Sequence, residues 1–414
     1  MKKSLFAIAA VTAFAGAAQA QSSVTVYGIV DYGFTGNNTR VAGTGTNGQT
    51  VAKTTGAGFA QGSETTTRLG FRGTEDLGGG LSAFFTVEMA LAMDGTQAIS
   101  TSTSSNRQAF VGLRKNGIGA VSMGTQYTPI HLAAGATDPG QLNNVFGNVI
   151  YANTGGASRD NQTTNEANGS TFGYTVRASN SIYLKSDKFY GFTPSLFYTQ
   201  NNSTSNETIT STSTATTVAG GTNNNRGYGV GLDYTWNKLL ATANYQSFKS
   251  ENPYVQTVAT GAIAPTTAWG VAGANTPGAN VNDTQFYGAV TYDFGILKAY
   301  AQYLNRKVQS NVDSGQYMKR SAQQIGVRSF ITPKVEGWAS IGNGRINAFG
   351  TNAPTANFTG WQLGSNYWLS KRTNLYAIYG ANNTSNVTVN LTNTTQATKS
   401  ANYGQYAVGV RHTF

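Results

Sequence analysis

Segments of about ten residues, in which apolar and polar side chains alternate, recur along most of this chain. From Tyr228 to Trp236 every even position is aromatic or aliphatic, and every odd position is Gly, Asp or Thr. The same period runs through Phe286–Phe294 and Trp361–Leu369, and it ends the chain at Tyr406–Phe414. A period of two is typical of strands with one apolar and one polar face. The chain is therefore expected to be all-β.

Two architectures explain such alternation. A soluble sandwich packs its apolar faces on a second sheet, whereas a transmembrane barrel turns them to lipid and its polar faces to a water-filled lumen. Here the polar faces are rich in Gly, Asn, Gln, Lys and Arg, and aromatic residues gather near strand ends, as at Tyr234 and Tyr367. Membrane barrels carry aromatic girdles at those levels. The chain also has no cysteine and hence no disulfides. We predict an antiparallel transmembrane β-barrel.

Turns and long polar stretches alternate between the predicted strands, as in outer-membrane barrels, which have short turns on one side and long loops on the other. The short turns fall at Asp76–Gly80, Asn116–Gly119, Asn237-Lys238, Gly295-Ile296, Pro333-Lys334 and Lys371-Arg372. The long stretches are Gly36–Ser63, Thr128–Val176, Asn201–Asn225, Ser250–Asn280 and Ala381–Asn402. Sixteen strands are predicted, starting near Val24, Thr65, Leu81, Arg107, Ala120, Ala178, Thr193, Arg226, Leu239, Asp283, Leu297, Arg320, Val335, Asn357, Asn374 and Tyr403. A barrel of this size encloses an aqueous channel.

The first twenty residues are predicted to be a cleaved signal peptide. Lys2 and Lys3 precede an apolar run from Leu5 to Ala18, and Ala18-Gln19-Ala20 gives a small-x-small cleavage pattern. A helical N-terminal anchor is the alternative, although the run is short for a membrane span. Residues 21–414 are then predicted to form a single barrel domain. Its formal charge is +9, because the leader removes two lysines from the total of +11.

Several fragments in the same order resemble the general porins of Gram-negative bacteria, in particular the β-proteobacterial branch. They are Ser23–Asp31, Thr67–Leu81, Arg107–Leu113, Arg177–Tyr183 and Val410–Phe414. The resemblance implies a homotrimer of sixteen-stranded barrels in the outer membrane, each with its third long loop folded into the lumen. It implies passive diffusion of small hydrophilic solutes and ions, with no cofactor. Outer-membrane lipid and lipopolysaccharide would surround the barrel, and Phe414 would carry the signal for the barrel-assembly machinery.

The resemblance also suggests a pore constriction in which wall arginines face acids of the inward loop. The candidate arginines are Arg68, Arg107 and Arg177. Alternation independently directs Arg68 and Arg72 away from Leu69 and Phe71. It likewise directs Arg177 and Lys185 away from Ile182 and Leu184. A lipid-facing arginine at mid-depth would cost about 2–4 kcal/mol, so these side chains are expected in the lumen.

Arg107 breaks the alternation, because it shares the parity of Val111 and Leu113. Either a bulge intervenes, or this strand is covered on both faces near a trimer interface. The candidate loop acids are Asp138, Asp160 and Glu166, with His131 and Arg159 nearby. At Gly124-Thr125-Gln126 the chain lacks the arginine that commonly follows this glycine in the family, so one basic group of the constriction is expected to be missing. Few acids facing several arginines predict a preference for anions.

Other functions find less support in the sequence. The two histidines, His131 and His412, are expected to lie far apart, so neither a metal site nor a Ser-His-acid hydrolase is predicted. Basic residues are scattered and form no patch for nucleic acid. Two alternatives share the same barrel. One is a substrate-selective sugar or organic-acid channel with an aromatic slide formed by Tyr183, Tyr287 and Tyr300. The other is an adhesin that acts through outer loops such as Thr257–Ala274.

Overall fold

The computed structural model describes residues 23–44, 50–93, 106–151, 173–211, 216–251, 281–310, 317–347, 355–388 and 398–414. The predicted leader at 1–20 lies outside these residues. The strands are β1 (Ser23–Thr44), β2 (Thr50–Gln61), β3 (Arg68–Gly78), β4 (Leu81–Ala90), β5 (Asn106–Lys115), β6 (Gly119–Tyr127), β7 (Arg177–Ser186), β8 (Phe192–Ser211), β9 (Thr216–Trp236), β10 (Leu239–Glu251), β11 (Val281–Asp293), β12 (Lys298–Ser310), β13 (Tyr317–Phe330), β14 (Val335–Asn347), β15 (Ala356–Trp368), β16 (Thr373–Thr388) and β17 (Thr398–Thr413). A helix, α2 (Pro129–Thr137), follows β6. Among the described residues, no helix is long and apolar enough to cross a membrane.

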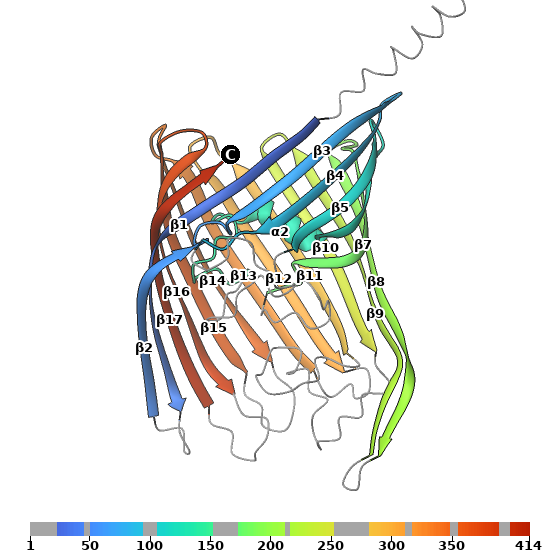
Figure 1. Ribbon diagram of the computed structural model, residues 1–414. Coiled ribbons are helices and arrows are strands. Elements are labelled where there is room, and N and C mark those ends of the chain that lie inside the picture. The colour runs from blue at the N-terminus through green and yellow to red at the C-terminus, as the bar shows by residue number, and fades with distance from the viewer. Residues whose placement is uncertain are drawn as a thin grey trace, which may run out of the picture.

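The strands form one closed antiparallel barrel (Figure 1). β1 closes it by pairing with β17, from Ile29 opposite Thr413 to Ala42 opposite Ser400. On its other side β1 pairs first with β3 and then with β2, which lie end to end along the same edge. β2 and β3 are therefore two halves of one wall strand, interrupted at residues 62–67. Seventeen assigned strands thus make sixteen barrel strands, and the predicted fold class is confirmed.

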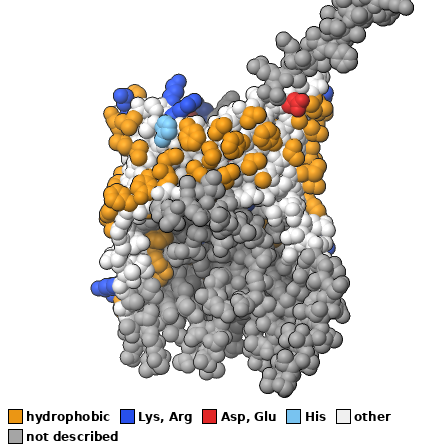
Figure 2. Space-filling view, in the orientation of Figure 1, with side chains coloured by type: hydrophobic (Ala, Val, Ile, Leu, Met, Phe, Trp, Pro, Cys, Tyr) orange, Lys and Arg blue, Asp and Glu red, His pale blue; other side chains and the backbone are white. Residues whose placement is uncertain are grey.

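Alternating burial separates the two faces of the wall. In β12 the side chains of Gln302, Leu304 and Arg306 are buried, whereas Tyr303 is 41% exposed. Many apolar side chains face outward in this way, and they gather in a band across the face of the barrel that Figure 2 shows. Aromatic pairs such as Phe286–Tyr303 and Tyr292–Phe294 lie at two levels of this outer face. An exposed apolar band of this kind is stable only against hydrocarbon.

The predicted short turns are all present at one end of the barrel. Asn237 and Lys238 join β9 to β10 as a two-residue turn, in which Asn237 has a φ of +49°. Asparagine tolerates this left-handed conformation better than most residues. A further turn at residues 187–191, which sequence analysis missed, joins β7 to β8. Fourteen of the sixteen predicted strand starts fall within five residues of the observed ones. The exceptions are Thr65, because its wall strand already begins with β2 at Thr50, and Arg226, because β9 begins ten residues earlier at Thr216.

Three stretches predicted to be loops contain long strand extensions, and these predictions were wrong. β1 and β2 continue through most of Gly36–Ser63, β8 and β9 through most of Asn201–Asn225, and β16 and β17 through much of Ala381–Asn402. Their residues are Thr-, Asn- and Ser-rich, because these hairpin ends extend beyond the apolar band and neither face needs apolar side chains. Pairing still satisfies the backbone groups that face a partner strand there, and water can satisfy the others. The hydrophobic period therefore ends before the strand does.

Candidate functional site

Neighbouring strands bring a cluster of charged side chains to one side of the lumen. Arg68 of β3 and Arg107 of β5 contact Glu88 of β4, and Arg177 of β7 lines the same cleft. Arg107 Nε donates to Glu88 Oε1 at 2.8 Å, and Arg68 Nη1 lies 3.5 Å from the same oxygen. The Tyr27 hydroxyl donates to Glu88 Oε2 at 3.1 Å. One buried carboxylate thus holds two guanidinium groups in place.

Tyr127, at the end of β6, joins the third arginine to this group. Arg107 Nη2 donates to the Tyr127 hydroxyl at 2.9 Å, and the Arg177 guanidinium lies over the Tyr127 ring at 5.2 Å. A guanidinium is attracted to the negative face of an aromatic ring. The tyrosine therefore orients two cations that would otherwise repel each other.

A bulge turns Arg107 into the lumen. Glu88 pairs with Gln108, but Met89 pairs with Asn106, so Arg107 is the extra residue of β5. The bulge reverses the parity of this strand, and Arg107 is 3% exposed beside Glu88. The sequence left two explanations open for Arg107, and the structure shows that the bulge is the correct one. Thr125 stands directly after Gly124, where the family commonly has an arginine. The next residue, Gln126, is buried and accepts a hydrogen bond from Ser122 Oγ at 2.6 Å.

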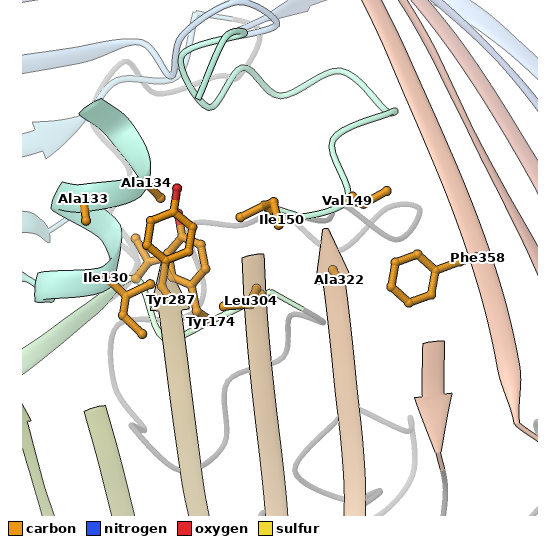
Figure 3. Packing of buried hydrophobic residues seen from close by; sticks show 11 residues of the cluster. Ile130, Ala133, Ala134, Val149, Ile150, Tyr174, Tyr287, Leu304, Ala322 and Phe358 are labelled. Carbon is orange, nitrogen blue, oxygen red and sulfur yellow. The ribbon is translucent and has the colours of Figure 1, made fainter. Parts of the chain in front are cut away.

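The segment from Thr128 to Tyr151 folds into the lumen opposite the arginines. It begins with α2, which Thr128 caps and Pro129 starts. Apolar side chains hold it on the far wall: Figure 3 shows Ile130, Ala133 and Ala134 of α2 near Tyr287, and Val149 and Ile150 close to Leu304, Ala322 and Phe358. Thr137 Oγ1 also lies 2.5 Å from the Tyr287 hydroxyl.

Polar contacts extend this anchoring to β14–β17. Gln362 of β15 exchanges hydrogen bonds with Asn143 (2.6 and 2.9 Å), and Gln405 of β17 accepts one from Phe146 N. A Cβ atom on Gly380 would lie 1.9 Å from the Phe146 carbonyl oxygen, so only glycine lets the loop approach the wall this closely. The inward segment is thus fixed along nearly half of the lumen wall.

Asp138 does not face the arginine cluster, contrary to the prediction. It ends α2, is 2% exposed and accepts hydrogen bonds from Leu142 N, Asn148 Nδ2 and Gln324 Nε2 at 2.8 to 3.0 Å. Burial raises the pKa of Asp138, and these donors oppose the shift only in part. Asp138 therefore holds the inward segment on the barrel wall and does not line the constriction.

The other predicted residues lie apart from the cluster. Arg72 follows Arg68 further along β3, with its guanidinium 5.3 Å from the Tyr27 ring centroid. Lys185 is near the short-turn end of β7 and lies 3.8 Å from Asp233, roughly 25 Å along the strand from Arg177. Asp160 and Glu166 fall outside the described residues. His412 is exposed on the outer face, as alternation predicted.

A cleft of about 350 Å³ separates the inward segment from the arginine wall. Its lining includes Arg68, Arg107, Arg177 and a fourth arginine, Arg411 of β17. Arg411 Nε lies 3.6 Å from Glu64 Oε2, and the guanidinium stacks over Trp368. Arg411 was not predicted as a site residue, although its parity opposes that of Val410 and His412. On the loop side the lining includes His131 and Asn144. No aspartate or glutamate occurs among the described residues that line the cleft.

Comparisons with known proteins agree with this architecture. A family profile described as Gram-negative porin matches residues 7–390. An outer membrane porin protein of Bordetella pertussis is 28% identical over 406 residues, covering 92% of this chain and 94% of that protein. Outer membrane porin protein 32 of Delftia acidovorans is 43% identical over 129 residues, which cover 31% of this chain and 33% of the relative.

Solved structures share the fold. An anion-selective porin from Comamonas acidovorans superposes with a TM-score of 0.63 at 23% identity, and the match covers 95% of this chain and all of that one. The family profile spans most of the chain. The chain belongs to the Gram-negative porin family, and it is an outer-membrane β-barrel through which small hydrophilic solutes and ions diffuse.

Proposed function

We propose that this porin prefers anions and that the cleft beside the inward segment is its selectivity constriction. The observation that carries the proposal is the lining of that cleft by four arginines and, among the described residues, by no acid. Fixed charges at a narrow place set the electrostatic barrier to ions. Glu88 and Glu64 offset part of the arginine charge from behind the lining, which leaves a net excess of two positive charges.

The proposed constriction residues are Arg68, Arg107, Arg177 and Arg411. Arg72 and Lys185 would add positive charge to the path between the constriction and the short-turn end. Asp160 and Glu166 stay proposed acids of the inward loop. Asp138 is withdrawn from this role, because its oxygens are occupied by donors of the loop and the wall.

We further propose a passive channel with no reaction chemistry, since selection by size and charge needs neither a catalytic group nor a cofactor. Among the residues that the structure describes, no group of three His, Cys, Asp or Glu could hold a metal ion. The mature protein is proposed to be a homotrimer of single-domain barrels, residues 21–414, assembled through recognition of Phe414 and surrounded by lipid and lipopolysaccharide. Tyr287 and Tyr300 are buried, which disfavours the aromatic slide of a sugar channel.

Reversal potentials test the anion preference. Refolded protein in a planar bilayer, with a tenfold KCl gradient, should give a chloride-to-potassium permeability ratio above one. Replacing Arg177 with Gln should lower that ratio about tenfold, because a unit charge about 6 Å from the ion path contributes about 0.7 kcal/mol in water, with opposite sign for chloride and potassium. Arg372→Gln, in a short turn, is the matched control and should leave the ratio unchanged. A parent channel that prefers potassium would refute the proposal.

A further inference from the structure

Three cations cluster on the lipid-facing side of β12–β14, close to the long-connection end. Lys307 of β12 lies directly opposite Lys319 of β13. Arg345 of β14 lies opposite Ser321, two residues from Lys319, and is therefore its diagonal neighbour. Lys319 and Arg345 are exposed, and Lys307 Nζ lies 5.0 Å from the centre of the Tyr317 ring. Alternation puts all three on the face that also carries Tyr303, Ile325 and Ile341.

Nothing described on this outer face neutralises the three charges. Like charges directly opposite in a sheet destabilise it, and on the inner face the next pair along the strands, Arg306 and Arg320, is also basic. The described acids of β11–β15 are elsewhere: Asp283 pairs with Arg306 in the interior, Glu336 pairs with Arg328, and Asp293 ends β11 near the short turn. The outer patch therefore favours an anionic partner from outside the chain.

A groove begins next to this patch, at Gln323 and Asn343, and runs toward the middle of the apolar band. It has a volume of about 690 Å³ and is lined by Gly288, Ala301, Tyr303, Ile325 and Ile341, among others. Small side chains on β11 and β12 form its floor. A Cβ atom on Gly288 would meet only ordinary contacts, the nearest at 3.5 Å in the Phe286 ring. The groove is thus a mostly apolar depression whose lining suits a hydrocarbon chain.

An amide pair lies where the groove approaches the cations. Gln323 Nε2 donates to Asn343 Oδ1 at 3.0 Å, and both side chains are exposed on the lipid-facing surface. Gln323 is level with Tyr303, whose ring contacts Phe286 in the aromatic row. Polar amides at that depth are expensive unless a polar group meets them. Lys307 lies four residues beyond Tyr303, about 13 Å along the strand, where lipid phosphates are expected.

We propose that this surface binds one phosphorylated glycolipid of the outer leaflet, the lipid A part of lipopolysaccharide. A phosphate contacts Lys307, Lys319 and Arg345, the sugar amides and hydroxyls meet Gln323 and Asn343, and an acyl chain fills the groove over Gly288. The order of cation, amide and apolar groove along the barrel matches the order of phosphate, sugar and acyl chain in that lipid. Basic clusters next to a membrane recognise phosphorylated headgroups by the same electrostatics.

Native mass spectrometry of the refolded full chain with bisphosphorylated lipid A tests the proposal. The variant K307Q/K319Q/R345Q should bind the lipid at least tenfold more weakly, since each basic residue near a membrane surface adds measurable affinity. The control K334Q/K371Q/R372Q removes three charges from short turns at the other end and should bind like the parent. G288L, which fills the groove and keeps every cation, should also bind more weakly.

Two further measurements distinguish the phosphate of a lipid headgroup from free inorganic phosphate. Monophosphorylated lipid A should bind more weakly than the bisphosphorylated form, and inorganic phosphate at millimolar concentration should not displace the lipid. Undiminished binding by the triple-Gln variant, or displacement of the lipid by inorganic phosphate alone, would overturn the proposal. Reversal potentials of the same variants should match the parent. A failed lipid site would therefore leave the proposed anion preference untouched, and a failed anion preference would leave the lipid site untouched.

Discussion

At the scale of single residues, the constriction depends on how few carboxylates accompany its arginines. Glu88 contacts Arg68 and Arg107 and accepts a hydrogen bond from Tyr27, so it organises the cluster and also subtracts from its charge. It is 3% exposed and lies behind the guanidinium groups. Glu88 is therefore needed to position the arginines, although its negative charge weakens the anion preference that we propose.

Replacing Glu88 with Gln separates the two roles. The amide keeps an oxygen that can accept from Arg107, while one negative charge beside the ion path disappears. We expect the chloride-to-potassium permeability ratio to rise about tenfold, by the same Coulomb argument as for Arg177. Reversal potentials measure the ratio. Glu75→Gln, an exposed glutamate near the short-turn end of β3, is the control and should change nothing; a fall in the ratio for E88Q would contradict the electrostatic account.

A second prediction concerns Asp138 and the stability of the inward segment. Its two oxygens accept three hydrogen bonds from the loop and from Gln324. In Asp138→Asn an NH₂ group replaces one oxygen and faces a donor, which costs about 1–3 kcal/mol. The inward segment should loosen, and open-channel current noise should increase without a change in the sign of selectivity. Asp293→Asn, whose acceptor role is on the surface, should leave the noise at the parent level.

At the scale of elements, the strands have two sections that follow different rules. Where a strand faces lipid, side chains must alternate, because lipid meets one side and water the other. Beyond the apolar band both sides meet water, and only backbone hydrogen bonds hold the pair. The β8–β9 hairpin has both sections, with alternation from Leu196 to Tyr198 and polar residues from Asn201 outward.

Shortening that hairpin should therefore be tolerated. Asn202 lies opposite Asn224, so deleting residues 203–223 and joining the two with an Asn-Gly turn keeps the register. We expect the barrel to fold, with an unchanged heat-dependent shift in SDS gels. One residue inserted after Leu196 should abolish folding, since a one-residue slip turns every following side chain to the wrong medium. Loss of the folded band in the deletion variant would show that the extension is needed for folding.

At the scale of the whole molecule, barrel closure depends on the last residue. Gly28 N donates to Phe414 O and Phe414 N donates to Gly28 O, each at 3.1 Å. A Cβ atom on Gly28 would lie 2.4 Å from the Phe414 ring and 2.7 Å from the Arg68 carbonyl oxygen. At position 28, where β1 pairs with the C-terminal residue and with β3, only glycine fits without displacing these neighbours.

Gly28→Val should obstruct this closure. The added side chain must displace a ring and a backbone carbonyl, and overpacking of this kind typically costs about 1–3 kcal/mol. In refolding into detergent micelles without assembly machinery, the folded fraction in SDS gels should fall and appear more slowly. Gly58→Val is the matched control, because nothing lies within 4 Å of a Cβ there. Equal refolding of both variants would rule out a tight seam.

The charge of the molecule predicts how salt acts on selectivity. The total is +11, but most of that charge lies away from the constriction. The screening length falls from about 10 Å at 0.1 M salt to about 3 Å at 1 M. The chloride preference should therefore decrease toward one between these concentrations, as measured by reversal potentials at a fixed gradient ratio. A ratio that does not depend on salt would indicate that pore size, and not the arginine field, selects the ion.

Much of the fold could be predicted, because lipid and water impose a local rule on each residue of a lipid-facing strand. Strand starts such as Leu81, Leu239 and Val335 were predicted at the observed residue. The rule does not apply at Arg107, where a bulge depends on pairing with β4, or in the polar hairpin ends. It also says nothing about Asp138, whose contacts come from strands far along the chain.

The sequence by itself determined a barrel with an apolar outer face and a polar, water-facing inner face. It also determined which end carries the short turns and that Arg68 and Arg177 point into the lumen. Each of these follows from residues within one strand, so periodicity carries the information. Only the tertiary structure decided that Glu88 and Tyr127 gather three arginines, that Arg411 joins them across the barrel seam, and that Asp138 anchors the loop. Those contacts join strands through closure of the sheet, and no local pattern encodes the distance between residues that closure brings together.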